Sequence, residues 1–115
     1  MKPVSDEGVE LRMRVAREFA EWLREELGEI VLDVRVFGST ARGDVHEESD
    51  VDVFILVSRP LSTEERLELG GKSFDILMET NIFVQWVEQT LERWERPLIH
   101  NSAFGRAVRG EGVPV

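Results

Sequence analysis

The first periodic pattern along the chain predicts an amphipathic helix from Glu10 to Leu27. An apolar residue recurs at every fourth position, as on the buried stripe of a surface helix. The stripe consists of Leu11, Val15, Phe19, Leu23 and Leu27, widened by Ala16 and Trp22. Ser5 or Asp6 is expected to cap its first turn. Gly28 is expected to end it, because glycine readily adopts the left-handed conformation that follows many helices.

Two β-strands are predicted after this helix. Residues Ile30 to Phe37 are rich in β-branched side chains and lead into Gly38. On this strand the residues expected to face one way are Leu32, Val34 and Val36. Residues 39–49 are expected to form a turn with room for one helical turn. A second strand is predicted from Asp50 to Val57, where Ser58-Arg59-Pro60 closes it.

A short helix, a third strand and a long helix are predicted next. The motif Ser62-Thr63-Glu64-Glu65 has the form of a capping box, so a helix should run to about Leu69 and end at Gly70-Gly71. A strand is expected over Lys72–Met78. Thr80 or Asn81 would then cap a helix that ends before Pro97. The broad apolar face of that helix is marked by Ile82, Phe83, Trp86, Val87, Thr90, Leu91 and Trp94.

The remaining pattern predicts a possible last helix over Leu98–Val108 and an extended tail over Gly110–Val115. The element order is therefore α-β-β-α-β-α, with that helix after it. This order is typical of an α+β (mixed α/β) fold with a small sheet flanked by helices. At 115 residues, 1–115 should form a single domain.

Composition narrows the functional classes. The chain has 23 acidic and 14 basic residues and a net charge of −9, which disfavours direct binding to nucleic acid and suits a basic protein partner or simply solubility. Cysteine is absent, so disulfides, thiolate zinc sites and cysteine nucleophiles are excluded. No apolar run has the length that a bilayer requires. We therefore expect a cytoplasmic protein without a membrane segment.

The candidate chemistry lies between the first two strands. Gly38 permits a positive φ and a close backbone approach, so the amides around Ser39 can point at a phosphate, with its hydroxyl as a further donor. Asp50 and Asp52 alternate on the next strand, so they should share one face, while Val51 faces the core. Two carboxylates on one face repel each other unless a cation lies between them.

A divalent metal would resolve that repulsion, because Mg²⁺ commonly binds one or two carboxylates together with substrate phosphates. Asp75 is expected on the third strand, with its side chain opposite the core. If that strand neighbours the strand of Asp50 and Asp52, three carboxylates converge. Such a triad could hold two metal ions, and Asp75 could accept the proton of a nucleophile.

The spacing of Gly38-Ser39, ten residues and Asp50-Val51-Asp52 resembles the signature of the minimal nucleotidyltransferases related to DNA polymerase β. The flanking residues Ala41-Arg42-Gly43-Asp44 also resemble that family, and the short, acidic chain is most similar to the antitoxin partners of HEPN-type toxins. The resemblance implies a polymerase β-like fold and a metal-binding triad of Asp50, Asp52 and Asp75. It also implies that Gly38 and Ser39 contact the triphosphate of ATP.

What the resemblance implies for function is transfer of AMP from ATP to a tyrosine of the toxin, with which the protein would associate. This chain contains no tyrosine, so the acceptor must lie on another molecule. Two alternatives stay open. The domain could neutralise the toxin by binding alone, or it could transfer a nucleotide to a small-molecule hydroxyl. The chain alone does not choose between a homo- and a hetero-oligomer.

For the other polar residues of this region, local structural roles are alternatives to a role in binding ATP or metal. Arg42 could contact a triphosphate oxygen or pair with Asp44 or Glu47 in its own loop. Ser49 is expected to be a cap or turn residue. Surface or local hydrogen-bonding roles are expected for His46 and His100, which lack metal-ligand spacing.

Overall fold

The computed structural model describes residues 4–115, so residues 1–3 of the predicted domain lie outside the described part. Its helices are α1 (Asp6–Leu27), α2 (Gly38–Arg42), α3 (Thr63–Thr80), α4 (Leu91–Trp94), α5 (Pro97–His100) and α6 (Ala103–Glu111), with a 3-10 turn η1 (Gly28–Ile30). Its strands are β1 (Val31–Phe37), β2 (Val51–Val57), β3 (Val84–Thr90) and β4 (Val113–Pro114). The predicted α+β class, a small sheet flanked by helices, is confirmed.

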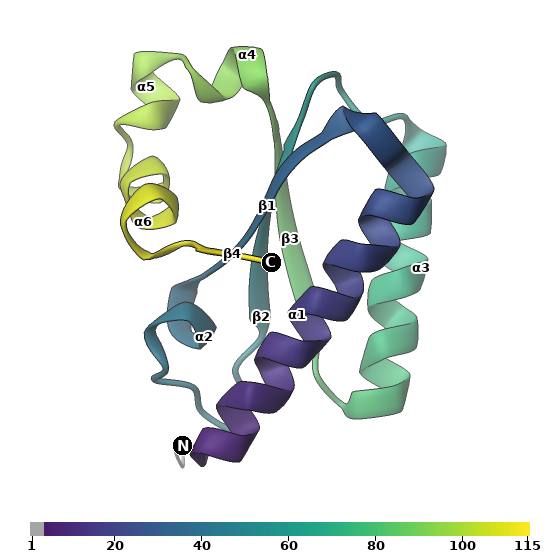
Figure 1. The fold of residues 1–115 in the computed structure, drawn as a ribbon, viewed down its shortest axis with the longest axis vertical. Coiled ribbons are helices and arrows are strands. Elements are labelled where there is room, and N and C mark those ends of the chain that lie inside the picture. Colours follow the sequence, from purple (N-terminus) through teal and green to yellow (C-terminus); the bar gives the residue numbers. More distant parts are fainter. Residues whose placement is uncertain (1–3) are drawn as a thin grey trace.

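The four strands form one sheet in the order β3-β2-β1-β4 (Figure 1). The two central strands, β1 and β2, pair antiparallel, with Phe37 opposite Asp52. The next pair, β2 and β3, is parallel and joined by the crossover helix α3. A parallel connection needs such a crossover, so α3 is an obligatory part of the sheet's topology.

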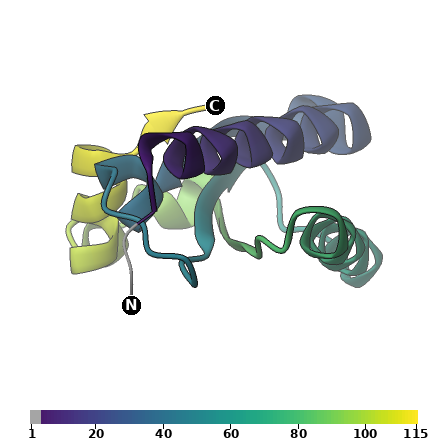
Figure 2. The ribbon, with the colours of Figure 1, turned by 90° about the horizontal axis from the view of Figure 1, so that it is seen from below.

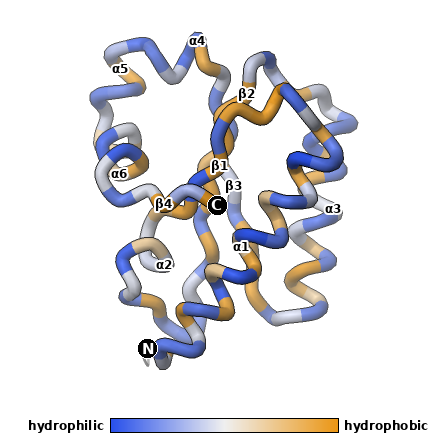
Figure 3. Tube along the Cα trace, viewed as in Figure 1, coloured by the Kyte–Doolittle hydropathy of each residue, from blue (hydrophilic) through white to orange (hydrophobic). Residues whose placement is uncertain are grey.

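Helices cover both faces of this sheet. Figure 2 shows α1 and α3 away from the group formed by α4, α5 and α6. The face toward α1 and α3 buries the odd-numbered residues of β2, namely Val51, Val53, Ile55 and Val57. The opposite face packs Phe54 against Trp94, Phe104 and Val108. Hydrophobic residues therefore follow one another along β2, which is orange for much of its length in Figure 3.

The first helix confirms the prediction for α1, although it begins at Asp6. Its N-cap is Ser5, whose hydroxyl accepts a hydrogen bond from the amide of Gly8, and its C-cap is Gly28 with a φ of 61°. The following strand also forms where expected. Leu32 does not share the buried face of Val34 and is 46% exposed, because the register of β1 shifts between residues 31 and 33.

The predicted end of the next helix at Gly70-Gly71 and the predicted strand over Lys72–Met78 are both wrong. A single helix, α3, runs from its Ser62 capping box to Thr80 and ends at Asn81, which has a φ of 60°. Its buried residues Leu69, Ser73 and Ile76 follow the helical spacing of four and three. The alternation of Phe74, Ile76 and Met78 was therefore misleading, since the first and last are exposed.

The long helix predicted over residues 82–94 is also wrong. This segment forms β3, followed by the short helix α4, whose N-cap is Thr90. Ile82 and Val84 are buried and Trp86 packs on the same core, which is the period of two expected of a strand. Pairing with β2 along all seven residues of β3 overrides the helical spacing of the apolar residues.

The C-terminal region forms two short helices where one was predicted. Instead of one helix over Leu98–Val108, α5 and α6 are separated by two residues, and the hydroxyl of Ser102 caps α6. The tail predicted as extended is helical to Glu111, and only then does β4 pair with the edge of β1. None of the helices within residues 4–115 has the length and apolar character needed to span a membrane.

Candidate active site

The predicted phosphate turn lies directly against the second strand. Strand β1 ends at Phe37, and Gly38 continues the chain with a φ of 73° into the short helix α2. A Cβ atom at Gly38 would lie 2.5 Å from Oδ2 of Asp52. Glycine is therefore favoured here, because of its φ and because a side chain would displace the carboxylate beside it. The structure brings together the turn and Asp52.

The two carboxylates of the motif lie in different surroundings. Asp50 is exposed and immediately precedes β2, whereas Asp52 is half-buried on the face that also carries Phe54. Burial raises the pKa of the Asp52 carboxyl above its usual value, and the negative charge of Asp50 raises it further. Arg42 acts in the opposite direction and lowers that pKa. The site thus places two carboxyl groups of like charge near one cationic side chain.

Arg42 itself adopts a pairing that the sequence left open. Its guanidinium makes ion pairs with Asp44, at 3.4 Å, and with Glu111 at the end of α6, at 3.1 Å. Glu47 is not among its partners in the described residues. Two exposed ion pairs hold this side chain only weakly, so it can exchange a carboxylate for a phosphate oxygen.

The third predicted carboxylate does not join this site. Asp75 lies on α3, in the helical layer on the other face of the sheet, and lines a groove with Trp22 and Glu26 of α1. Within residues 4–115, no group of three or more His, Cys, Asp or Glu side chains is placed to hold a metal ion. The expected convergence of Asp50, Asp52 and Asp75 is therefore wrong, because its premise was a strand over Lys72–Met78.

The position beside Asp52 on the neighbouring strand belongs to Gln85. The two residues are in register between the parallel strands β2 and β3, and Gln85 is exposed. Residues in register on adjacent parallel strands project from the same face of the sheet. Gln85 thus offers a neutral amide where a third acid was expected. The sequence signal that could have located it is the alternation of Val84 and Trp86 around it.

A second residue missed by the sequence interpretation is Arg12, which lies on α1. It is buried, 6% exposed, and its guanidinium donates hydrogen bonds to the carbonyl oxygens of His46 and Glu47, both at 3.4 Å, and of Ser49, at 3.5 Å. These carbonyls belong to the loop before Asp50. Arg12 therefore holds that loop to α1.

Local roles were expected for the loop's other polar side chains. The hydroxyl of Ser49 accepts a hydrogen bond from the amide of His46 at 2.8 Å, which confirms its role as a turn residue. His46 is partly buried in the same turn. His100 lies far along the chain, with its ring against Trp94, at 5.3 Å between centroids. Neither histidine lies in a group that could hold a metal in the described residues.

The donor set suits a divalent cation. Carboxylate oxygens are the ligands that Mg²⁺ prefers, and a site with one or two of them is usually completed by phosphates and water. Asp50 and Asp52 supply two such groups. The like charge and burial that raise the pKa of Asp52 would both be offset by a bound cation. The residues present therefore fit one metal ion whose remaining ligands come from the substrate.

Comparison with known proteins decides the family. The sequence profile of the nucleotidyltransferase domain matches residues 16–108, which include Gly38, Asp50 and Asp52. This chain belongs to the nucleotidyltransferase domain family. The resemblance to nucleotidyltransferases noted from the sequence is confirmed, and nucleotidyltransferase activity follows from it.

Individual relatives agree with this assignment. This chain is 36% identical over 86 residues to a protein of Methanocaldococcus jannaschii named "Putative protein adenylyltransferase". The aligned region covers 70% of this chain and 83% of the relative.

Two solved structures share the fold. One is a toxin-antitoxin with AMP-PNP, with a TM-score of 0.57, 20% identity and coverage of 84% of this chain and 69% of that one. The other is a tri-AMPylated Shewanella oneidensis HEPN toxin in complex with MNT antitoxin, with a TM-score of 0.55, 16% identity and coverage of 90% and 70%.

Proposed function

We propose that this nucleotidyltransferase transfers AMP from ATP to a hydroxyl group of a partner protein and thereby acts as the antitoxin of a HEPN-type toxin. The observation that carries the proposal is the position of the Asp52 carboxylate directly beside the Gly38 turn, with a pKa raised by burial and by the charge of Asp50. The name of the archaeal relative supports protein adenylylation. The toxin-antitoxin structure with AMP-PNP supports ATP as the substrate, and the Shewanella oneidensis complex supports a HEPN toxin as the partner.

In the reaction, the acceptor oxygen attacks the α-phosphorus of ATP and forms a new P–O bond. The bond from that phosphorus to the oxygen bridging to the β-phosphate breaks, pyrophosphate leaves, and the hydroxyl proton passes to water. The amides at Gly38 and Ser39 would hold the triphosphate. Asp50 and Asp52 would hold Mg²⁺, which neutralises charge on the phosphates. A second ion would depend on ligands from the substrate.

The acceptor is a tyrosine of the partner in this proposal. The chain contains no tyrosine of its own, so modification of a tyrosine has to occur on another molecule. An exposed site suits such a reaction, because Asp50 and Gln85 are both exposed and leave room for a protein segment to approach.

The test is transfer of labelled AMP from ATP, with Mg²⁺, to the protein encoded beside this chain. We expect label on that protein with the wild type and none with Asp50→Asn/Asp52→Asn. Glu48→Gln is the matched control, since Glu48 is an exposed acid of the same loop. Equal labelling by the wild type and the double variant would refute catalysis by these carboxylates.

Neutralisation by binding alone is a second candidate, and Gln85 is the observation that favours it. An amide beside Asp52 supplies no third negative charge for a metal ion and no proton acceptor. If Asp50→Asn/Asp52→Asn still suppresses the toxin fully at native expression, binding suffices. Loss of suppression together with loss of label would assign the antitoxin effect to AMP transfer.

A further inference from the structure

Helix α3 carries an apolar stripe on the side that faces away from the molecule. Leu67, Phe74 and Met78 are 72%, 57% and 64% exposed. With Gly71 they follow spacings of four, three and four residues, so they lie in one row along the helix. The residues that α3 buries against the sheet occupy its opposite side. Figure 1 shows this helix at the outer margin of the fold, where no other helix or strand of residues 4–115 covers its outward face.

The same helix carries a row of acids beside the stripe. Its members are Glu64, Glu68, Asp75 and Glu79, and all four are exposed. Among residues 4–115, no lysine, arginine or histidine nitrogen lies within 4.0 Å of these four carboxylates. The helix's own cations are engaged elsewhere, since Arg66 pairs with Glu88 and Lys72 with Glu18. The edge of the stripe is therefore negative and uncompensated.

Gly71 in the middle of the stripe has no explanation within the chain. Glycine destabilises a helix interior relative to alanine. The neighbouring Gly70 has an internal partner, because a Cβ there would contact the ring of Trp86 at 3.9 Å. A Cβ at Gly71 would meet no atom within 4 Å. A helix surface without a side chain at its centre lets another backbone approach closely.

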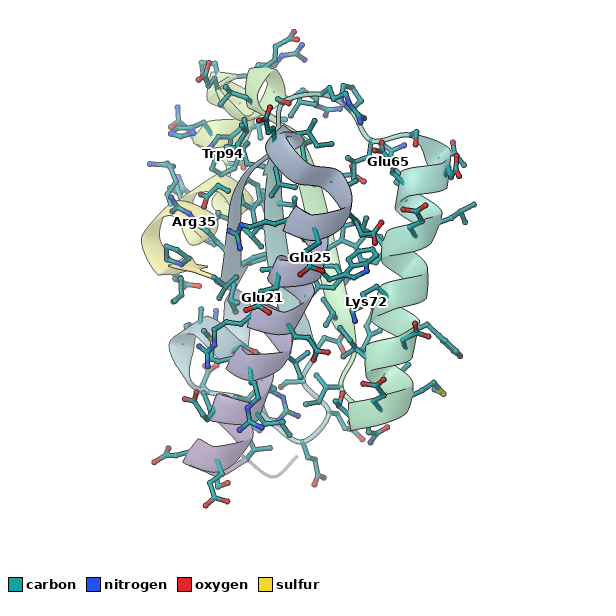
Figure 4. All side chains as sticks on the ribbon, turned by 45° about the vertical axis from the view of Figure 1, so that its right-hand side comes forward. Glu21, Glu25, Arg35, Glu65, Lys72 and Trp94 are labelled. Atoms are coloured by element: carbon teal, nitrogen blue, oxygen red, sulfur yellow. The ribbon has the colours of Figure 1, made fainter. Side chains whose placement is uncertain are left out.

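A groove of about 290 Å³ opens next to this position, between α3 and α1. Its lining includes the acids Glu26, Glu68 and Asp75 and the indole of Trp22. Lys72 lies between the two helices in Figure 4. An arginine or lysine side chain suits such a lining, because carboxylates and an indole face both attract cations.

We propose that the outward face of α3, defined by Leu67, Gly71, Phe74 and Met78 with the acidic row beside them, is a docking surface for a basic amphipathic helix of a partner protein. An amphipathic helix would lay its apolar side on the stripe, as in other helix-in-groove interfaces. Its basic flank would face the acidic row and reach into the groove. A second copy of this chain is disfavoured as the occupant, because each copy brings a net charge of −9 and the same acidic row.

The surface is well placed to present a partner to the active site. The stripe runs along α3 toward Met78, and the chain then turns at Asn81 into β3. Val84 at the start of β3 pairs with Val51 of β2, and Val51 directly follows Asp50. A partner docked on α3 would thus extend past the end of the sheet that carries Asp50 and Asp52, although the docking itself needs neither carboxylate.

The first test measures binding without ATP, so its failure is distinguishable from failure of AMP transfer. The probe is a synthetic helix of about 18 residues with leucines in one row and lysine and arginine on its flanks. A matched peptide keeps the leucines but carries glutamate on its flanks. We expect the basic peptide to shift the amide NMR signals of α3 and the indole signal of Trp22, and the acidic peptide to leave them unchanged. Absence of binding by the basic peptide would overturn the proposal.

Variants locate the surface. Phe74→Gln should weaken binding of the basic peptide roughly tenfold or more. The control is Leu98→Gln, since Leu98 is 91% exposed but lies on a different helix, α5. This variant should bind the basic peptide as tightly as the wild type does. Gly71→Ala should weaken binding while raising the Tm of the free chain by roughly 2–6 °C. Equal affinity for wild type and Phe74→Gln would refute the assignment. Sedimentation of the chain alone tests the other occupant. A concentration-dependent dimer that Phe74→Gln abolishes would also refute the assignment, because the surface would then bind a second copy.

Discussion

Replacing Gly38 with alanine should displace the carboxylate of Asp52 without unfolding the chain. The new Cβ would lie 2.5 Å from Oδ2 of Asp52. That oxygen would have to move by roughly 0.5–0.9 Å to reach a contact of 3.0–3.4 Å. It is the end of a flexible side chain, so rotation of the carboxylate relieves the contact more cheaply than a shift of β2.

Gly43 offers a matched control for the cost to the backbone. Its φ is 77°, close to the 73° of Gly38, yet a Cβ at Gly43 would meet no atom within 4 Å. A residue with a side chain in the left-handed region costs about 1–2 kcal/mol. Gly38→Ala and Gly43→Ala should therefore lower the free energy of unfolding by similar amounts, measured by urea denaturation.

Activity should separate the two variants. A displacement of the order of 1 Å at a reacting centre can lower a rate by about 10²-fold. We expect a loss of that order in AMP transfer for Gly38→Ala, whereas Gly43→Ala should keep most of its activity at a temperature where both are folded. Equal rates for the two variants would show that the position of the Asp52 carboxylate does not matter, and would refute the reasoning from the Gly38 contact.

Four further outcomes are expected. Arg12→Met should lower the free energy of unfolding by about 1–3 kcal/mol in urea, because the carbonyls of the loop before Asp50 lose a buried donor; an unchanged midpoint would contradict this. Asp50→Asn should lower the raised pKa of Asp52, followed by carbon NMR, since a neighbouring charge is removed. The raised pKa favours protonated Asp52 in the folded state, so the stability it gives is present below the unfolded pKa and lost as pH rises through the folded pKa. This contribution should shrink in the variant, and an unchanged pKa would contradict the influence of Asp50. Gln85→Asp should tighten Mn²⁺ binding in calorimetry by adding a carboxylate beside Asp52; weaker binding would count against Gln85 facing the site. Asp75→Asn should keep the transfer rate at saturating partner, and a loss there would return Asp75 to the active site.

The sequence predicted the first half of the molecule well because its signals are local. In α1 the apolar stripe, the Ser5 cap and the closing Gly28 all indicate the same helix. The turn at Gly38 and the alternation on β2 follow equally from short-range rules. The family resemblance rests on this part of the chain, and the profile match confirms it.

The second half failed where pairing distant in the sequence decides the structure. Residues 72–78 alternate like a strand, but the capping box at Ser62 starts a helix that no left-handed residue stops before Asn81. Residues 84–90 have helical apolar spacing, but β2 offers a partner along their whole length. Because the third strand was predicted over residues 72–78, Asp75 was expected in the site and Gln85 was missed. The register between β2 and β3 places Gln85 beside Asp52.

The crossover between the parallel strands also has an evolutionary consequence. The buried residues of α3 are Leu69, Ser73 and Ile76, and the hydroxyl of Ser73 donates a hydrogen bond to the carbonyl of Val84. The outward residues of this helix, such as Leu67, Phe74 and Met78, can change without disturbing the sheet that aligns Asp52. Chains with the same catalytic sheet can therefore diverge in the molecules they recognise through changes confined to one helix, and orthogonal pairs could be engineered by exchanging residues 63–80 alone.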